Sequence, residues 1–272
     1  MVSSILFYAA GVWGFEEATE CNKVQSRALR CFLGVHKYTT KLAIEGDTGW
    51  ESCLIKQRCE MVRLWNRLIQ LPEERLTKIV FNWNRTGNFP WIREVSSIFS
   101  ICDLSLYFMN NLHCNINMIR NKMLILHKEQ WRVDICKKAK LRNYVQFKDE
   151  YITEPYVRFN LRRGQRSLCA QLRSGALPLA VEVGRYTGIP EEQRLCVLCD
   201  LGVVEDEFHF MFYCPCYHEL RMSLFEIIQN KNPDLFWMSE SCMLNWLFNK
   251  EVFVVARYIE KAWQLRWRTL YP

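Results

Sequence analysis

The sequence predicts a mainly α-helical protein. Apolar side chains recur every three to four residues in one segment after another, which is the spacing of a single helix face. The alternation of apolar and polar residues that marks a half-buried strand is weak everywhere in the chain. Half of the 272 residues are hydrophobic, which is enough to build a core and excludes a disordered tail. We therefore expect a body of packed helices.

The first half of the chain is expected to form short helices separated by Gly and Pro. The apolar stretch 3–15 is too short for a confident membrane span and lacks the basic start of a signal peptide, so we interpret it as a buried helix or the interior of a larger domain. Residues 36–49 are expected to form a loop or a short helix. The periodicity and the breakers predict helices at 20–33, 54–69 and 73–83 and a further one from Pro90.

The second half is expected to contain longer helices. Residues 118–150 hold almost no helix breaker, which predicts one long helix or two in succession. A helix with Pro155 at its first position should run to Gly175, with a bend or break at Gly164 left open. The apolar spacing predicts the last helices at 217–229, 243–248 and 252–270.

A cluster of potential metal ligands lies between residues 194 and 217. Two, nine and four residues separate its members, which are Cys196, Cys199, His209 and Cys214. This set suits one tetrahedral zinc ion, and because four protein ligands leave no position for water or substrate, we expect a structural zinc. We expect a small CCHC zinc-binding subdomain with at most a short β-hairpin. Cys216 or His218 could replace Cys214, and the alternative is a set of reduced core residues without metal.

The spacing of the last two ligands constrains the local structure. Acidic residues 205–207 are expected at the N-terminus of a helix that carries His209, where the helix dipole favours negative charge. Cys214 follows five residues later, which is about 140° further round an ideal helix. One ligand must therefore leave the helix, and Pro215 supplies the stop.

Positive charge is concentrated before this cluster. Residues 117–173 contain fourteen Lys and Arg against five Asp and Glu, a net charge of +9, whereas the whole chain carries +7. On an unbroken helix four arginines would share an arc of about 80°: Arg158, Arg162, Arg166 and Arg173. Such a stripe suits phosphate contacts, and the alternative is a solvated face with salt bridges. The full candidate patch for nucleic acid also includes Lys138, Lys140, Arg142 and Arg163.

The thirteen cysteines bear on the compartment. An odd number scattered over a long chain does not suit a secreted disulfide framework. Those outside the ligand cluster are expected to be small buried hydrophobes in a reducing environment. We therefore expect an intracellular protein of the nucleus or cytoplasm, with no membrane partner.

Several stretches together have the pattern of one family. They are YAAGVWGF at 8–15, RCFLGV at 30–35, LRNYVQFK at 141–148, EPYV at 154–157, QRSL at 165–168, QLRSG at 171–175, LPL at 177–179, EVGRY at 182–186 and EDEFHF at 205–210. In these stretches the chain resembles the C-terminal part of a non-LTR (LINE-type) retrotransposon reverse transcriptase polyprotein. The resemblance runs from about residue 6 to residue 218.

The resemblance implies three regions and a function. It places a thumb-like helical region at 1–112, a basic helical region at 113–180, and the CCHC zinc domain with C-terminal helices at 181–272. It implies binding to RNA or DNA and contact with an upstream polymerase domain of the same polyprotein. The family's Tyr-x-Asp-Asp motif has no counterpart, because the sequence contains no Asp-Asp pair. No catalytic residue and no enzymatic activity are therefore expected.

One other class of function remains open, and a further one is disfavoured by the sequence. The chain could be a protein-interaction or scaffold module, or a degenerate retroelement remnant whose basic stripe is merely solvated. An independent zinc hydrolase or deaminase is disfavoured, because it would need an open ligand position and, for a deaminase, a Pro-Cys-x-x-Cys motif that is missing.

Overall fold

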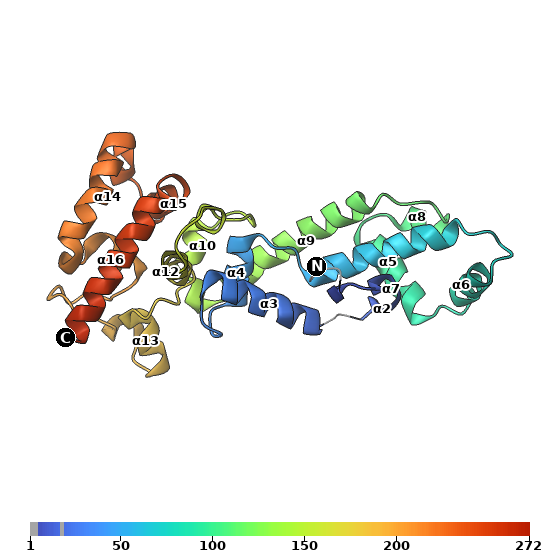
Figure 1. Cartoon of the computed structure of the whole chain (residues 1–272), viewed down its shortest axis with the longest axis horizontal. Helices are drawn as coiled ribbons and strands as arrows, with labels where there is room; N and C mark the ends of the chain where they lie inside the picture. Colours follow the sequence, from blue (N-terminus) through green and yellow to red (C-terminus); the bar gives the residue numbers. More distant parts are fainter. Residues whose placement is uncertain (1–4, 17–18) are drawn as a thin grey trace. The chain divides into compact units, whose positions relative to one another are not determined.

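The protein is mainly α-helical, as the sequence predicts (Figure 1). The computed structural model describes residues 5–16 and 19–272. Within these ranges the only β pairing is one antiparallel bridge between Leu195 and Val204. The chain divides into two compact units, so that Met1–Ser26 and Glu51–Gln130 form unit 1 whereas Arg27–Trp50 and Trp131–Pro272 form unit 2. The chain passes between the units after Ser26, Trp50 and Gln130, and none of these positions is one of the expected boundaries after 112 and 180.

Unit 1 is a set of helices around an aromatic core. Its elements are α2 (Ala10–Trp13), the first part of α3 (Thr19–Leu33), α5 (Cys53–Ile69), α6 (Leu76–Thr86), α7 (Pro90–Ile101), α8 (Ser105–Met109) and most of α9 (Ile116–Cys136). The indole of Trp65 on α5 is fully buried and stacks on Phe108, with Phe81 and Phe99 at its edges. Burial of such large rings stabilises this unit.

The N-terminal apolar stretch lies in unit 1. Its residues 3 and 4 lie outside the described ones. Ala10 on α2 is buried, whereas Tyr8 and Val12 are exposed. The helix is four residues long and packs on α5. Among residues 5–15 the expected buried helix is therefore represented by residues 5–6 and by α2, which has one face covered.

Unit 2 contains the rest of the helices. They are α4 (Lys41–Thr48), α10 (Tyr144–Phe147), α11 (Pro155–Arg158), α12 (Arg163–Arg173), α13 (Ala180–Tyr186), α14 (His218–Lys231), α15 (Glu240–Lys250) and α16 (Val252–Leu270), with five short 3-10 or π turns, η1 (Ala139–Leu141), η2 (Glu191–Gln193), η3 (His209–Tyr213), η4 (Pro215–Tyr217) and η5 (Pro233–Trp237). Helix α16 packs against α12, α14 and α15. The final helix is thus the centre of the C-terminal half.

The expected helix from Pro155 to Gly175 is two helices. Helix α11 ends at Arg158, and Phe159 is extended with φ −77° and ψ 152°. Helix α12 begins at Arg163, after the backbone N–H of Arg162 donates to the side chain of Gln165 in a capping arrangement. The break therefore lies before Gly164 and removes the unbroken helix on which the four-arginine stripe depended.

Candidate metal centre and basic surface

The four predicted ligand side chains converge in unit 2. The ligand atoms of Cys196, Cys199, His209 and Cys214 all lie within 4.8 Å of one another. The sulfurs of Cys196 and Cys214 are 3.9 Å apart, and the Cys199 sulfur is 3.5 Å from Nε2 of His209. A tetrahedral zinc ion with ordinary bond lengths would set these two separations at about 3.8 Å and about 3.6 Å. The residues therefore fit one metal ion with a closed shell.

A widened helical turn brings the last two ligands together. The backbone N–H of Cys214 donates to the carbonyl of His209 at 2.9 Å, which closes a π turn over His209–Tyr213. This i to i+5 bond widens the turn, so that Cys214 lies closer above His209 than it would on an α-helix, and the angular mismatch is reduced. Cys214 then leaves the helix with ψ 121°, and Pro215 follows. The prediction that one ligand steps off the helix before Pro215 is confirmed.

The first two ligands lie on a tight hairpin-like loop. The Cys196 N–H donates to the Val203 carbonyl at 2.9 Å, and the Glu205 N–H donates to the Arg194 carbonyl at 3.0 Å. Gly202 has φ +63° within this loop, a conformation that side chains disfavour. The single bridge between residues 195 and 204 is all that forms of the expected short β-hairpin.

The three acidic residues before His209 have different roles. Asp206 caps the helix, because its carboxylate accepts the His209 N–H at 2.8 Å. Glu207 is buried and accepts from Asn143 at 2.5 Å and from Arg142 at 3.1 Å. Burial raises the pKa of Glu207, and the Arg142 charge offsets part of this. The helix-dipole explanation therefore accounts for Asp206 but not for its neighbours.

Two side chains from the C-terminal helices hold the π turn in place. Arg221 on α14 is 3% exposed and donates to the carbonyls of Met211 at 2.9 Å and Cys214 at 2.7 Å. The hydroxyl of Tyr258 on α16 donates to the carbonyls of Phe210 at 2.9 Å and Met211 at 3.2 Å. A π turn frees backbone carbonyls that a buried site must satisfy. These two residues satisfy them.

A buried ion pair connects the cluster with the end of the chain. Glu205 is fully buried and forms a two-pronged pair with Arg266 on α16, while its Oε2 accepts the Ala180 N–H at 2.8 Å. The other carboxylate oxygen lies 3.7 Å from the Cys196 sulfur. Arg266 carries a full charge, yet it is only 5% exposed. Its spacing from Ile259 and Ala262 could have shown that it lies on the buried stripe.

The thiols of the cluster perturb one another. The hydrogen bond between Cys214 and Cys196 lowers the pKa of Cys196 and raises the pKa of Cys214. The set therefore forms one thiolate easily and resists losing the next proton. Thiolate is the metal-binding form of Cys, so a dication bound between the sulfurs would stabilise both Cys196 and Cys214 as thiolates.

The two competing ligands of the sequence lie outside the cluster. Cys216 is exposed, and its sulfur lies 3.1 Å from the Leu198 carbonyl. His218 is the first residue of α14. Among the described residues, the metal-compatible group contains Cys214 and neither of these two. Cys214 is therefore the fourth candidate ligand.

Arg173 is not part of a nucleic-acid surface. It is 1% exposed, and its guanidinium donates to the Asp47 carboxylate at 2.9 and 3.1 Å and pairs with Glu154 at 3.1 Å. Asp47 also accepts from the hydroxyls of Tyr144 at 3.0 Å and Tyr156 at 2.7 Å. The prediction that Arg173 contacts phosphate is wrong, because α12 directs this side chain into the core.

Two more of the predicted cations are engaged with carboxylates. Lys140 pairs with Glu182, and both side chains are largely buried. Arg142 pairs with Glu207 at 3.1 Å and with Glu191 at 3.5 Å. These cations compensate buried acidic groups, which reduces their value as phosphate contacts.

The remaining predicted cations are accessible to different degrees. Arg162 pairs with Glu260 on α16 at 2.6 Å, but its side chain is 72% exposed. Arg166 donates to the Phe32 carbonyl at 2.9 Å and lies 4.4 Å from the centre of the Phe32 ring. No ion pair in the described part of the chain involves the other three, which are exposed: Lys138, Arg158 and Arg163.

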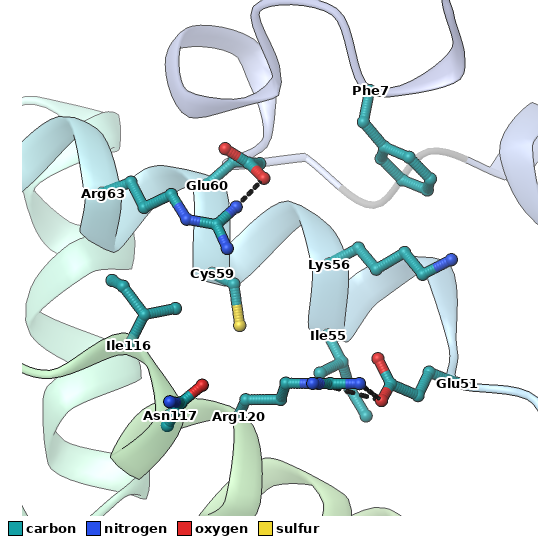
Figure 2. A pocket seen from close by; sticks show the side chains of 10 residues that line it. All are labelled: Phe7, Glu51, Ile55, Lys56, Cys59, Glu60, Arg63, Ile116, Asn117 and Arg120. Atoms are coloured by element: carbon teal, nitrogen blue, oxygen red, sulfur yellow. Dashed lines mark hydrogen bonds and ion pairs between the residues drawn. The ribbon is translucent and has the colours of Figure 1, made fainter. Parts of the chain in front are cut away.

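Unit 1 contains a separate cavity of about 430 Å³ (Figure 2). Lys56, Arg63 and Arg120 surround it, and Cys59 points towards its centre. Arg63 pairs with an acidic neighbour on its own helix, and Arg120 pairs with Glu51. Burial raises the pKa of Cys59 to about 11, so its thiol is protonated at neutral pH and is a poor nucleophile.

No protein-family model, no curated protein and no solved structure matches this chain. None of the helices in the described ranges has the length and the apolar character needed to cross a membrane. The geometry of unit 2 therefore carries the functional argument.

Proposed function

We propose that this chain is a non-catalytic nucleic-acid-binding module stabilised by one zinc ion, related to the C-terminal part of LINE-type reverse transcriptases. The observation that carries the proposal is the convergence of the Cys-Cys-His-Cys set in a loop and π turn that follow the basic segment. The sequence resemblance is the basis for proposing nucleic acid as the partner. We place the protein in the nucleus or cytoplasm, because its thirteen free thiols suit a reducing compartment.

Zinc is the metal that this donor set favours. Three thiolates and one imidazole are soft to borderline ligands, and a tetrahedral arrangement of them is typical of structural zinc sites. Such a site contributes folding free energy and holds no substrate. The role proposed for it is to fix the loop and the π turn against α14 and α16, through Arg221, Tyr258 and Arg266.

The proposed contact surface is smaller than the sequence suggested. It consists of the accessible cations Lys138, Arg158, Arg162 and Arg163, with Arg166 partly occupied. Guanidinium groups match the geometry of phosphate oxygens and carry no information on base sequence by that contact. Binding to RNA or DNA should therefore be dominated by the backbone and weaken as salt rises.

The test measures binding of a random-sequence single strand across salt concentrations. Replacing Arg158, Arg162 and Arg163 by Ala should weaken binding and reduce the slope of log K against log salt by about 2, because each lost phosphate contact contributes about 0.7. The matched control removes the same charge from exposed positions of unit 1, by Ala at Arg67, Arg75 and Arg93. An unchanged slope in the first variant, or an equal loss in the control, would refute the proposed surface.

A protein-interaction module is the second candidate. Helix α6 exposes an apolar side at one-turn spacing, on which Leu76 is 74% and Trp83 66% exposed, with Ile79 and Val80 between them. Exposed apolar patches of this kind mark contact surfaces. An interaction module should not bind nucleic acid. It should self-associate through this face, and the double variant Leu76→Ser with Trp83→Ser should abolish the self-association measured by sedimentation. An upstream polymerase domain is the partner that the resemblance supplies for this face.

A further inference from the structure

A second cleft lies beside the candidate metal centre in unit 2. It has a volume of about 280 Å³, and its walls come from three segments that are distant in sequence. Pro178 and Val183 line one side, Val197 lies between the first two Cys ligands, and the last turns of α16 form the other side. The walls are almost entirely apolar side chains.

The α16 wall is a row of aromatic rings. Trp263, Trp267 and Tyr271 follow at intervals of four residues, so they lie on one side of the helix and its end. The rings of Trp267 and Tyr271 have centroids 4.5 Å apart. Trp267 is 57% and Tyr271 63% exposed. Large aromatic faces are thus exposed at the mouth of the cleft. Because burying such rings is favourable, they are available to bind a partner.

A row of cations runs along the same helix next to the aromatic row. At about 100° per residue, Arg257, Lys261 and Arg268 fall within an arc of about 40°, which is about 100° from Trp267. All three are exposed, and none takes part in an ion pair within the described ranges. Arg266 lines the cleft too, but its charge is compensated by Glu205.

The combination favours one class of occupant. An uncompensated cationic row excludes a basic partner and attracts a polyanion, whereas the apolar cleft needs a flat uncharged group. A single-stranded nucleic acid offers both, because its phosphates and its unpaired bases lie side by side along the chain. A duplex would keep its bases away from the cleft.

We propose that this cleft stacks an unpaired base of single-stranded nucleic acid on Trp267 and Tyr271, while the adjoining backbone follows Arg257, Lys261 and Arg268. The inference rests on the proposed nucleic-acid function and specifies that function as single-strand recognition. This contact requires the presence of a base, whereas the other proposed contacts involve phosphate alone. Stacking of this kind tolerates any base sequence.

The experiment compares two single-stranded DNA oligomers of equal length, one with thymine at every position and one with abasic sites throughout its central segment. The whole chain should bind the thymine oligomer about tenfold more tightly, because a base stacked on an aromatic ring stabilises the complex and an abasic site cannot stack. The double variant Trp267→Ala with Tyr271→Ala should lose this preference and bind both oligomers as the wild type binds the abasic one. Tryptophan fluorescence of the wild type should be quenched only by thymine.

The matched control is Trp237→Ala, because Trp237 is 90% exposed in the same unit and lies outside the cleft. It should keep the tenfold preference. Equal binding of the two oligomers by the wild type would overturn the stacking site and leave the proposed phosphate surface intact. No binding of either oligomer would overturn both. If the wild type dimerises and the double variant is monomeric with unchanged preference, the cleft is an interface between two copies and the stacking site is refuted.

Discussion

A substitution of Arg173 tests which cations of the basic segment 117–173 stabilise the fold and which contact nucleic acid. Its guanidinium makes three charge-assisted contacts, two with Asp47 and one with Glu154, and it faces the rings of Phe147 and Tyr156. Changing Arg173 to Ala removes these contacts and leaves two buried carboxylates with less compensation. Asp47 keeps two tyrosine hydroxyl donors. The variant should therefore be strongly destabilised, although Asp47 keeps part of its hydrogen bonding.

The magnitude follows from the burial of the network. Removing one partner of a buried ion pair costs about 3–5 kcal/mol, because a desolvated charge is left behind. The guanidinium is almost fully buried, so solvent cannot restore the lost contacts. A domain of ordinary stability has about 5–15 kcal/mol in total, so this loss would lower its unfolding midpoint greatly.

Urea unfolding followed by circular dichroism measures this loss, and Arg158→Ala is the control. Arg158 is exposed, and its removal should change stability by no more than about 0.5 kcal/mol while weakening nucleic-acid binding. Arg173→Ala should show the opposite pattern at temperatures where it is folded. A variant of Arg173 that unfolds like the wild type but binds nucleic acid poorly would refute the assignment of this residue to the core.

Three further predictions concern unit 2. Cys214→Ser should abolish the single bound zinc measured by metal analysis, whereas Cys216→Ser should retain it; retention in the former would exclude Cys214 as a ligand. Tyr258→Phe should lower the free energy of unfolding by about 1–2 kcal/mol in urea at constant m-value, because a buried carbonyl loses its donor. Burial raises the pKa of Glu45 above its ordinary value of 4.5, with Lys41 offsetting part. The folded protein therefore binds this proton more readily than the unfolded chain, and the wild type should gain stability relative to Glu45→Gln as pH falls from neutral towards 4.5. A gap between these two proteins that does not change with pH would contradict this.

The helices and the candidate ligand set could be read from the sequence, because both depend on local spacing. The apolar period of 54–69 predicts α5, and Pro90 marks the start of α7. The four ligand residues are recognisable because metal chemistry limits both residue type and separation. The π turn was not predictable in this way, since it depends on donors from Arg221 and Tyr258 that reach its carbonyls from other helices.

The sequence by itself determined the helical class, the positions of several helices such as α5 and α7, and the identity of the four candidate ligands. Only the tertiary structure decided which cations face solvent. Arg158 and Arg173 are both arginines of one basic segment, yet one is exposed and the other is buried against Asp47, 126 residues away in the chain. The physical reason is that a charge becomes structural when a distant carboxylate compensates its desolvation, and no local pattern records that partner.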